Sequence, residues 1–134
     1  MTPELRQGVW DRGAARCEHC HMPSEFDDSE FEIDHVIALF HDGRSVLSNL
    51  ALLCYWCNHF KGTNLSGIDP ATKRITNLFN PRRNRWAKHF RWDGPVLVGR
   101  TDIGRTTVST LRINRAFRVA PRRILMAEGV FPLD

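Results

Sequence analysis

The chain has 134 residues, of which 42% are hydrophobic and 25% are charged, and its formal net charge is +4. This length favours a single domain with a modest core, which a structural metal would help to stabilise. No apolar run is long enough to cross a bilayer, and the first residues lack the apolar core of a signal peptide. We therefore expect a cytoplasmic protein without a membrane partner.

Positive charge is concentrated in the C-terminal part of the chain. Residues 1–57 contain four Arg and ten Asp or Glu, a sum of −6, whereas residues 58–134 contain fifteen Lys or Arg and five Asp or Glu, a sum of +10. This asymmetry favours a polyanion as the partner of the C-terminal half. A solvated basic face without a specific partner is the alternative.

Hydrophobic periodicity predicts the elements of the N-terminal half. Leu5, Val9 and Trp10 lie at helical spacing within a first helix over residues 4–16. The elements expected next are a tight turn at 17–20, an acidic loop at 23–30, strands at 31–37 and 50–53, and a short helix at 54–61. After the first helix, the predicted order is therefore strand, loop, strand, helix.

The C-terminal half is predicted to contain shorter elements. We expect a surface loop at 63–72, strands at 75–79 and 96–99, and a helical turn at 84–90. Thr101 is the predicted N-cap of a helix that runs to about Asn114, and a last helix ends before Gly129. Pro121 must either begin a new segment or kink that last helix.

The most specific motif is a set of two Cys-x-x-Cys pairs. Its members are Cys17, Cys20, Cys54 and Cys57. In a cytosolic chain such pairs are metal ligands more often than disulfides, and thiolates at this spacing suit tetrahedral zinc. We predict one structural Zn²⁺, with isolated buried thiols as the alternative. The neighbouring His19 and His21 are not expected to be ligands, because four thiolates complete the shell.

A carboxylate, an imidazole and two amides accompany the cysteines. His35 is the candidate general base, because a neutral imidazole can accept a proton from water near neutral pH. Asp34 and Asn58 are candidate oxygen ligands for Mg²⁺ or Mn²⁺, and Asn49 is a candidate residue for orienting the loop near His35. In a regular strand Asp34 and His35 point to opposite faces. A shared site therefore requires the strand to end, bend or bulge there.

Each of these residues, taken alone, has an ordinary structural alternative. A histidine on a strand is often packed or solvated, and Asn58 could simply cap a helix. His41 could approach a phosphate or remain a solvated loop residue, and His59 is expected at the surface or beside the zinc ligands. The functional interpretation depends on the combination of residues within the cysteine frame.

That combination resembles the HNH endonuclease family. The matching segments are Cys17-x-x-Cys20, Asp34-His35, Asn49-Leu50, Leu53-Cys54-x-x-Cys57-Asn58 and Lys61-Gly62. The resemblance covers residues 5–62 and implies an α+β fold: a ββα-metal (HNH) core with four-cysteine zinc knuckles and a C-terminal helical extension over 63–134. The family often has Gly-Gly in the loop before Asn49, where this chain has His41-Asp42-Gly43.

The resemblance also implies a role for each matching residue. By this analogy His35 is the base, Asp34 and Asn58 hold the catalytic Mg²⁺ or Mn²⁺, and Asn49 supports the loop. The four cysteines would hold structural Zn²⁺. The position of the family's last histidine is Asn58 here, which many members share and which keeps a ligand oxygen.

Basic residues of the second half are candidate contacts to DNA phosphates. The predicted contacts are Lys61, Arg82, Arg83, Arg85, Lys88, Arg115 and Arg118. On an unbroken helix Arg112, Arg115, Arg118 and Arg122 would form one charged stripe. The interleaved aromatic residues Trp86, Phe90 and Trp92 are expected in the core. Such basic contacts position duplex DNA without reading its sequence.

These observations predict a metal-dependent HNH endonuclease that hydrolyses DNA phosphodiester bonds. The first alternative is a non-catalytic zinc-dependent nucleic-acid-binding protein, which would have no use for Asp34, His35 and Asn58 together. The second is an enzyme that acts on RNA, and the third is a zinc-bound interaction module without a nucleic-acid role.

Overall fold

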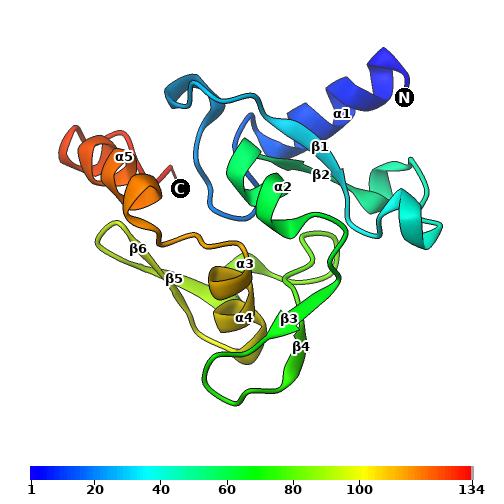
Figure 1. Cartoon of the computed structure of the whole chain (residues 1–134). Coiled ribbons are helices and arrows are strands. Elements are labelled where there is room, and N and C mark those ends of the chain that lie inside the picture. Colours follow the sequence, from blue (N-terminus) through cyan, green and yellow to red (C-terminus); the bar gives the residue numbers. More distant parts are fainter. Residues whose placement is uncertain (134) are drawn as a thin grey trace.

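The computed structural model describes residues 1–133 and has a mixed α+β architecture (Figure 1). The helices are α1 (Pro3–Gly13), α2 (Tyr55–Lys61), α3 (Trp86–His89), α4 (Asp102–Thr110) and α5 (Ala116–Ala127). The strands are β1 (Glu32–His35), β2 (Leu50–Leu53), β3 (Ser66–Ile68), β4 (Ile75–Asn77), β5 (Phe90–Asp93) and β6 (Val96–Gly99). Single 3₁₀ turns are η1 (Ser24–Phe26), η2 (Leu39–His41) and η3 (Leu47–Asn49). Within residues 1–133 the strands form three antiparallel pairs, β1–β2, β3–β4 and β5–β6.

The β1–β2 hairpin and α2 form the predicted strand, loop, strand and helix. Glu32 lies opposite Leu53 and His35 lies opposite Leu50 in the antiparallel register. All four residues of β2 are buried, with α1 packed against β2 and α2 packed against both strands (Figure 1). β1 ends at His35 rather than at Ile37, where the sequence placed its end. This early end proves important for the candidate site.

The first helix is shorter than its predicted range of 4–16. Thr2 caps it by accepting a hydrogen bond from the Leu5 amide at 3.1 Å, and Pro3 occupies the first turn. The helix ends at Gly13 because Ala14 and Ala15 both take positive φ angles of 54°. This reversal directs the chain into the first cysteine pair.

The C-terminal part contains α3, α4 and α5 and more strands than the two that the sequence predicted. It contains β3, inside the predicted surface loop, and β5, which pairs with the predicted β6. α4 packs against β3, β4 and β6, and a Cβ at Gly67 would lie 2.2 Å from Thr110 Oγ1. Glycine therefore allows β3 to approach the helix closely.

Both predicted signals at the helix ends of this region are confirmed. The Thr101 hydroxyl accepts a hydrogen bond from the Gly104 amide at 3.1 Å and caps α4. α5 ends before Gly129, which has a φ of +75°. Pro121 lies inside α5, so it does not begin a new segment.

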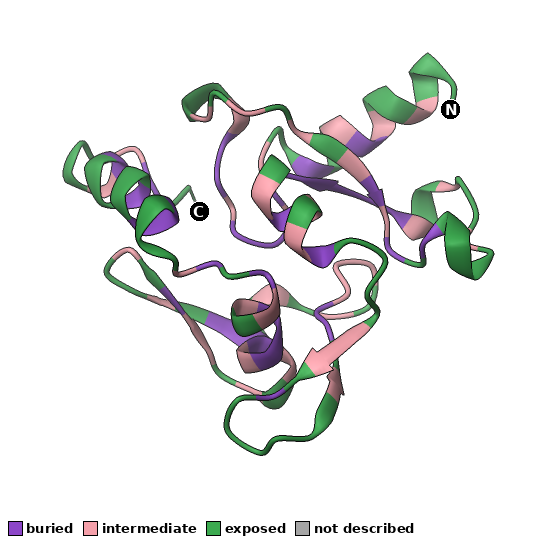
Figure 2. Ribbon diagram, in the orientation of Figure 1, coloured by how far each residue is buried: buried purple, intermediate pink, exposed green. Residues whose placement is uncertain are grey.

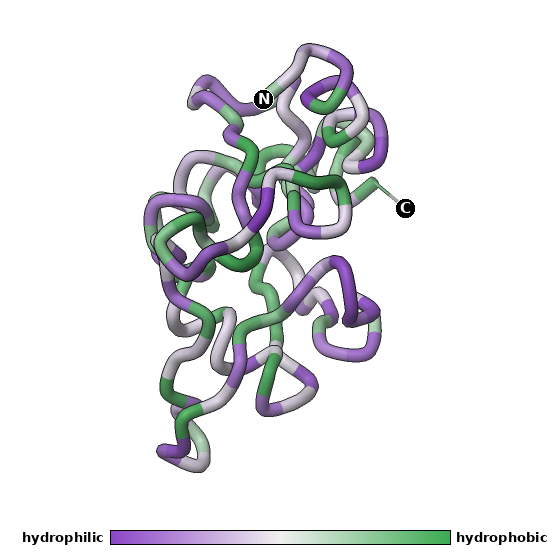
Figure 3. The backbone as a smooth tube through the Cα atoms, turned by 90° about the vertical axis from the view of Figure 1, so that its right-hand side faces the viewer, coloured by the Kyte–Doolittle hydropathy of each residue, from purple (hydrophilic) through white to green (hydrophobic). Residues whose placement is uncertain are grey.

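One buried cluster joins the two halves of the chain. Its members run from Cys17 near the N-terminus to Phe131 near the C-terminus, and they include Leu53, Phe90 and Leu111. Figure 2 shows β2 among the buried segments at the centre of the molecule. Figure 3 shows short hydrophobic segments alternating with hydrophilic ones along the backbone. Between residues 1 and 133, no helix has both the length and the apolar character that a membrane span requires.

His19, between the first two cysteines, is fully enclosed by this core. Its ring stands edge-on to Phe79 with the ring centroids 5.6 Å apart. Neither ring nitrogen has a hydrogen-bond partner within residues 1–133. Burial lowers the pKa of His19 to about 3, and the nearby charge of Lys61 acts in the same direction. The folded protein therefore holds this imidazole neutral.

We expect the free energy of unfolding to fall less in mild acid for His19→Leu than for the wild type. The imidazole has an ordinary pKa of 6.5 when unfolded and about 3 when folded, so between these values protons favour the unfolded chain. Each pH unit in that window corresponds to about 1.4 kcal/mol. Urea unfolding of both proteins should show that the advantage of the variant grows by about 2 kcal/mol between neutral pH and pH ~5. An advantage that does not change with pH would exclude His19 as the titrating group.

Candidate active site and zinc centre

The four cysteine side chains converge from two distant segments. Their sulfur atoms all lie within 4.8 Å of one another, and all four residues are buried, free cysteines. Cys20 Sγ and Cys54 Sγ are 3.7 Å apart. Sulfur atoms around a tetrahedral zinc, at Zn–S distances of about 2.3 Å, lie about 3.8 Å from one another. The geometry therefore fits one structural Zn²⁺ held by all four thiolates.

Local structure prepares the sulfur atoms for this role. The Cys20 amide donates to Cys17 Sγ, and the Cys57 amide donates to Cys54 Sγ, both at 3.5 Å. Cys54 is also the N-cap of α2. A thiolate at a helix N-terminus is favoured by the exposed amides and by the helix dipole.

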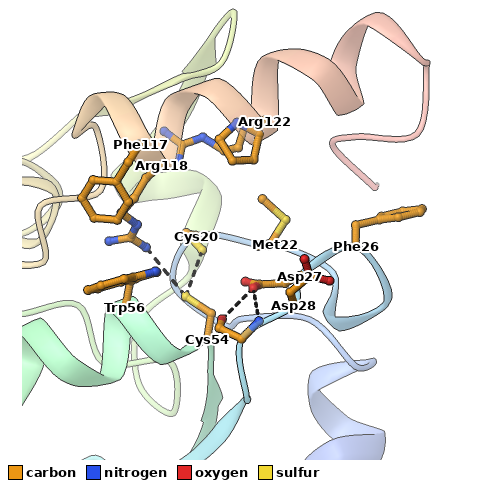
Figure 4. Close-up of a pocket in the computed structure, with 12 residues that line it drawn as sticks. Cys20, Met22, Phe26, Asp27, Asp28, Cys54, Trp56, Phe117, Arg118 and Arg122 are labelled. Atoms are coloured by element: carbon orange, nitrogen blue, oxygen red, sulfur yellow. Dashed lines mark hydrogen bonds between the residues drawn. The ribbon is translucent and has the colours of Figure 1, made fainter.

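A buried arginine from α5 contacts this centre, and Figure 4 shows it pointing towards the sulfur atoms. Arg118 Nη2 lies 3.0 Å from Cys57 Sγ and 3.7 Å from Cys54 Sγ, while Nη1 donates to the Leu111 carbonyl at 2.6 Å. Burial disfavours the charge of Arg118, but the negative charge of the cysteines outweighs it and raises the pKa of Arg118. The prediction that Arg118 contacts DNA is therefore wrong, because its guanidinium is buried against the cysteines.

Three of the four predicted site residues meet in a shallow pocket at the end of β1, and the fourth, Asn49, lies outside it. Asp34 and His35 from β1 and Asn58 from α2 all line it, together with Leu39 and Phe40. In a regular strand Asp34 and His35 would point to opposite faces. They can line one pocket because β1 ends at His35. Asn58 lies one helical turn after Cys54, so the zinc ligand and the pocket residue are set on the same helix.

Asp34 is a buried carboxylate that has an ion-pair partner but no well-aligned hydrogen-bond donor to Oδ2 among residues 1–133. Lys61 Nζ lies 2.9 Å from Asp34 Oδ2, close enough for an ion pair. The ammonium is directed towards the carbonyls of His35 and Val36, at 3.4 and 3.5 Å, and Asp34 Oδ2 has no well-aligned hydrogen-bond donor in the described chain. Burial raises the pKa of Asp34, whereas the charges of Lys61 and His35 oppose the rise. This oxygen suits a hard divalent cation.

Lys61 is therefore not the free phosphate contact that the sequence suggested. Its side chain is buried at the end of α2, between Asp34 and the end of β1. In this position it supplies a positive charge beside the candidate metal ligand. Taking a buried ammonium away from a buried carboxylate leaves an uncompensated charge, which is costly.

Asn49 and Ser45 organise the loop beside His35. Asn49 Oδ1 accepts from the Ile37 amide at 2.9 Å, and Nδ2 donates to the carbonyls of Ile37 and Arg44 at 3.0 and 2.9 Å. The side chain thus ties both ends of the loop together, as its predicted position implied. Ser45 Oγ lies 2.8 Å from His35 Nε2 and fixes that ring nitrogen.

Asn58 has a partner that the sequence interpretation did not include. Its Nδ2 donates to Glu32 Oε2 at 2.8 Å, which leaves Oδ1 free to face a cation. The alternation of β1 puts Glu32 on the same face as Asp34, so this residue could have been found from the strand pattern. Nothing in the sequence pattern singled out Ser45.

The predicted basic contacts divide into buried and exposed residues. Arg83, Arg85, Lys88 and Arg115 are exposed. Arg82 pairs with Glu18 and donates to the Leu50 carbonyl at 3.1 Å, so it has a structural role. The charged stripe does not form: Arg112 and Arg115 precede α5, and Arg122 is buried with Nε donating to the Pro95 carbonyl at 2.8 Å.

We expect Cys54→Ser to lose the metal and to melt at a lower temperature, because structural zinc contributes directly to folding. Metal analysis should find one zinc per wild-type chain and less than one in the variant. Arg118→Met is the matched comparison: it should keep the zinc but lose about 3 kcal/mol of stability, since a buried charge partner is removed. Unchanged melting temperature and zinc content in Cys54→Ser would contradict the four-cysteine assignment.

We expect Lys61→Met to bind Mn²⁺ more tightly than the wild type, because the ammonium no longer competes for Asp34. The variant should be destabilised by about 3 kcal/mol without divalent metal, and Mn²⁺ should raise its melting temperature more than that of the wild type. The control is the double variant Asp34→Asn/Lys61→Met, in which Mn²⁺ should have little effect. An equal Mn²⁺ effect in the single and double variants would rule out Asp34 as a ligand.

Comparison with known proteins finds a family match for the segment that carries the site. The HNH endonuclease family model matches residues 17–64, which include both cysteine pairs and the predicted site residues Asp34, His35, Asn49 and Asn58. The chain is 24% identical over 126 residues to the Septu protein PtuB of Bacillus thuringiensis. This match covers 92% of the chain but only 46% of the relative, so the chain spans less than half the relative's length. No solved structure matches the chain. The similarity to the HNH endonuclease family is therefore located in residues 17–64.

Proposed function

We propose that the chain is a metal-dependent endonuclease that hydrolyses DNA phosphodiester bonds. The observation that carries this proposal is the pocket in which Asp34, His35 and Asn58 meet. A carboxylate oxygen, an amide oxygen and an imidazole are the groups that metal-assisted hydrolysis of a phosphodiester requires. Their place within the HNH domain supports the same chemistry.

In this mechanism the oxygens of Asp34 and Asn58 would hold Mg²⁺ or Mn²⁺. Once bound, the ion supplies a Lewis acid for the phosphoryl oxygen and stabilises the leaving 3′ oxygen. Glu32 orients the Asn58 amide through the hydrogen bond at 2.8 Å. Because Asp34 is buried and its pKa is raised, metal binding should weaken as the pH falls and the carboxyl takes up a proton.

His35 accepts the proton of the attacking water. Its Nε2 is paired with the Ser45 hydroxyl at 2.8 Å, so Nδ1 is the nitrogen left for the water. That role requires the tautomer with hydrogen on Nε2, which then donates to Ser45 Oγ. Asn49 acts on the reaction only through the loop that it holds in place. Residues 1–134 would act as one domain in this scheme.

The exposed basic residues would hold duplex DNA through its phosphates. Arg83, Arg85, Lys88 and Arg115 all lie on the surface of the C-terminal part. Contacts of this kind position the duplex without reading its sequence, and they weaken steeply as salt rises.

One observation favours a second candidate, a zinc-dependent nucleic-acid-binding protein without catalysis. The Lys61 ammonium lies 2.9 Å from Asp34 and partly neutralises the carboxylate without any divalent ion. If this ion pair persists in the presence of Mg²⁺, the pocket cannot hold the catalytic metal. The exposed basic residues and the zinc centre would be kept in such a protein.

We expect the wild type to nick supercoiled plasmid in Mg²⁺ or Mn²⁺ and to be inactive in EDTA. His35→Ala should lower the rate by a factor of about 10²–10⁴, the usual contribution of a general base. Gel analysis of the plasmid measures the rate, and anisotropy with a labelled duplex should show binding within a few-fold of wild type.

A matched control for this experiment is His59→Ala, which removes an exposed histidine of α2 that does not line the pocket. It should retain nearly full activity. DNA binding with no metal-dependent nicking would support the non-catalytic candidate. Full activity of His35→Ala would exclude His35 as the base, and a parallel digestion of RNA would test the choice of substrate.

A further inference from the structure

The rim of the candidate pocket carries exposed apolar side chains. Phe40 is 83% exposed and Leu39 is 62% exposed, and both line the same pocket as Asp34, His35 and Asn58. No large hydrophobic residue in the described part of the chain is more exposed than Phe40. Adjacent apolar side chains that are left in water beside a polar site are characteristic of a binding surface.

Hydrogen bonds fix the conformation of the loop that carries Phe40, so the exposure of this side chain follows from the fold. The Ala38 carbonyl accepts from the amides of His41 and Gly43 at 2.8 and 2.9 Å, and the Leu39 carbonyl accepts from the Asp42 amide at 3.0 Å. Asn49 fastens the loop at the Ile37 and Arg44 backbones.

Gly43 fixes the path of the same loop. A Cβ at this position would lie 1.6 Å from the Ile37 carbonyl oxygen, so the chain can close here only with glycine. The catalytic mechanism does not use the turn His41-Asp42-Gly43, but this turn fixes the position of Phe40. It presents the phenyl ring outward next to the pocket in a preorganised position.

We propose that Phe40, with Leu39 beside it, inserts between two bases of DNA next to the cleaved bond and unstacks that step. This inference rests on the proposed function of the pocket. A phosphate bound beside the cation that Asp34 and Asn58 would hold would bring the sugar and base of the same nucleotide to the rim, which Phe40 lines. Apolar side chains that enter a base step unstack it, and every base offers a face to an aromatic ring.

Charge near the loop favours nucleic acid over an apolar protein segment as the occupant. The exposed Arg44 follows the turn, and the exposed His41 ring stands edge-on to the Phe40 ring with centroids 5.2 Å apart. An aromatic side chain next to cationic or protonatable groups is the combination that stacking sites for nucleic acids use. The contact is independent of base identity, in agreement with a surface that positions DNA through its phosphates.

The test uses short duplexes with 2-aminopurine at successive positions, because the fluorescence of this base rises when it is unstacked. All measurements are made in Mg²⁺ on the His35→Ala background, which keeps the duplex intact. His35→Ala should raise the fluorescence several-fold at one or more positions. His35→Ala/Phe40→Ala should remove the rise and weaken binding by roughly five- to a hundredfold, the usual effect of losing one stacking contact.

Two further variants on the same background serve as controls. Ile75→Ala removes another side chain that is 77% exposed, on β4 and outside the pocket, and it should leave the fluorescence rise unchanged. Phe40→Trp should restore the affinity for the duplex, because indole also stacks on bases. Circular dichroism should show equal folding in all variants, since position 40 contributes little to the core.

The outcomes separate this inference from the proposed nuclease activity. An equal fluorescence rise with and without Phe40, in a protein whose wild type nicks plasmid, overturns the insertion and leaves the nuclease proposal intact. A rise that depends on Phe40 in a protein that does not nick supports the insertion and rejects catalysis. Absence of both the rise and the nicking overturns both.

Discussion

The meeting of four cysteine sulfurs is the constraint on which the candidate site depends. It joins the turn after α1 to the first turn of α2, and one helical turn later α2 carries Asn58 to the pocket. The paired strands β1 and β2 bring Asp34 to the same place. Arg118 extends this constraint to α5, because its guanidinium contacts the sulfur atoms from the other end of the chain. A small domain with a modest core gains both stability and positioning from such a centre.

Asp34 is a second feature of the site, because burial disfavours the charged form of its carboxylate. Asp34 is desolvated, and Lys61 stands beside it without aligning a hydrogen bond to its Oδ2 within residues 1–133. Lysine and a divalent cation would compete for the same oxygen. The ammonium lets the domain fold with Asp34 charged, and a divalent cation at the proposed site would have to displace that interaction. The two candidate functions differ in which cation Asp34 keeps.

The sequence alone predicted those features that have a characteristic spacing of residues along the chain. The cysteine pairs, the hairpin and α2 followed from ligand spacing and strand pattern, whereas Asp34, His35, Asn49 and Asn58 were grouped through the resemblance to the HNH family. The sequence did not predict which basic residues have structural partners, because Lys61, Arg82 and Arg118 look like any surface cation until those partners are known. β3 and β5 are short and lie in polar or basic segments, so tertiary pairing rather than local pattern decides them. Ser45 is identified only by its contact with His35, whereas the alternation of β1 already puts Glu32 on the same face as Asp34.

The most direct test of both metal assignments is diffraction from crystals grown with Mn²⁺, with anomalous data collected at the manganese and zinc absorption edges. We predict a zinc peak among Cys17, Cys20, Cys54 and Cys57, and a separate manganese peak between the oxygens of Asp34 and Asn58, with the Lys61 ammonium moved away. A zinc peak alone, with Lys61 still on Asp34 at saturating Mn²⁺, would contradict the catalytic assignment and leave a zinc-stabilised binding protein.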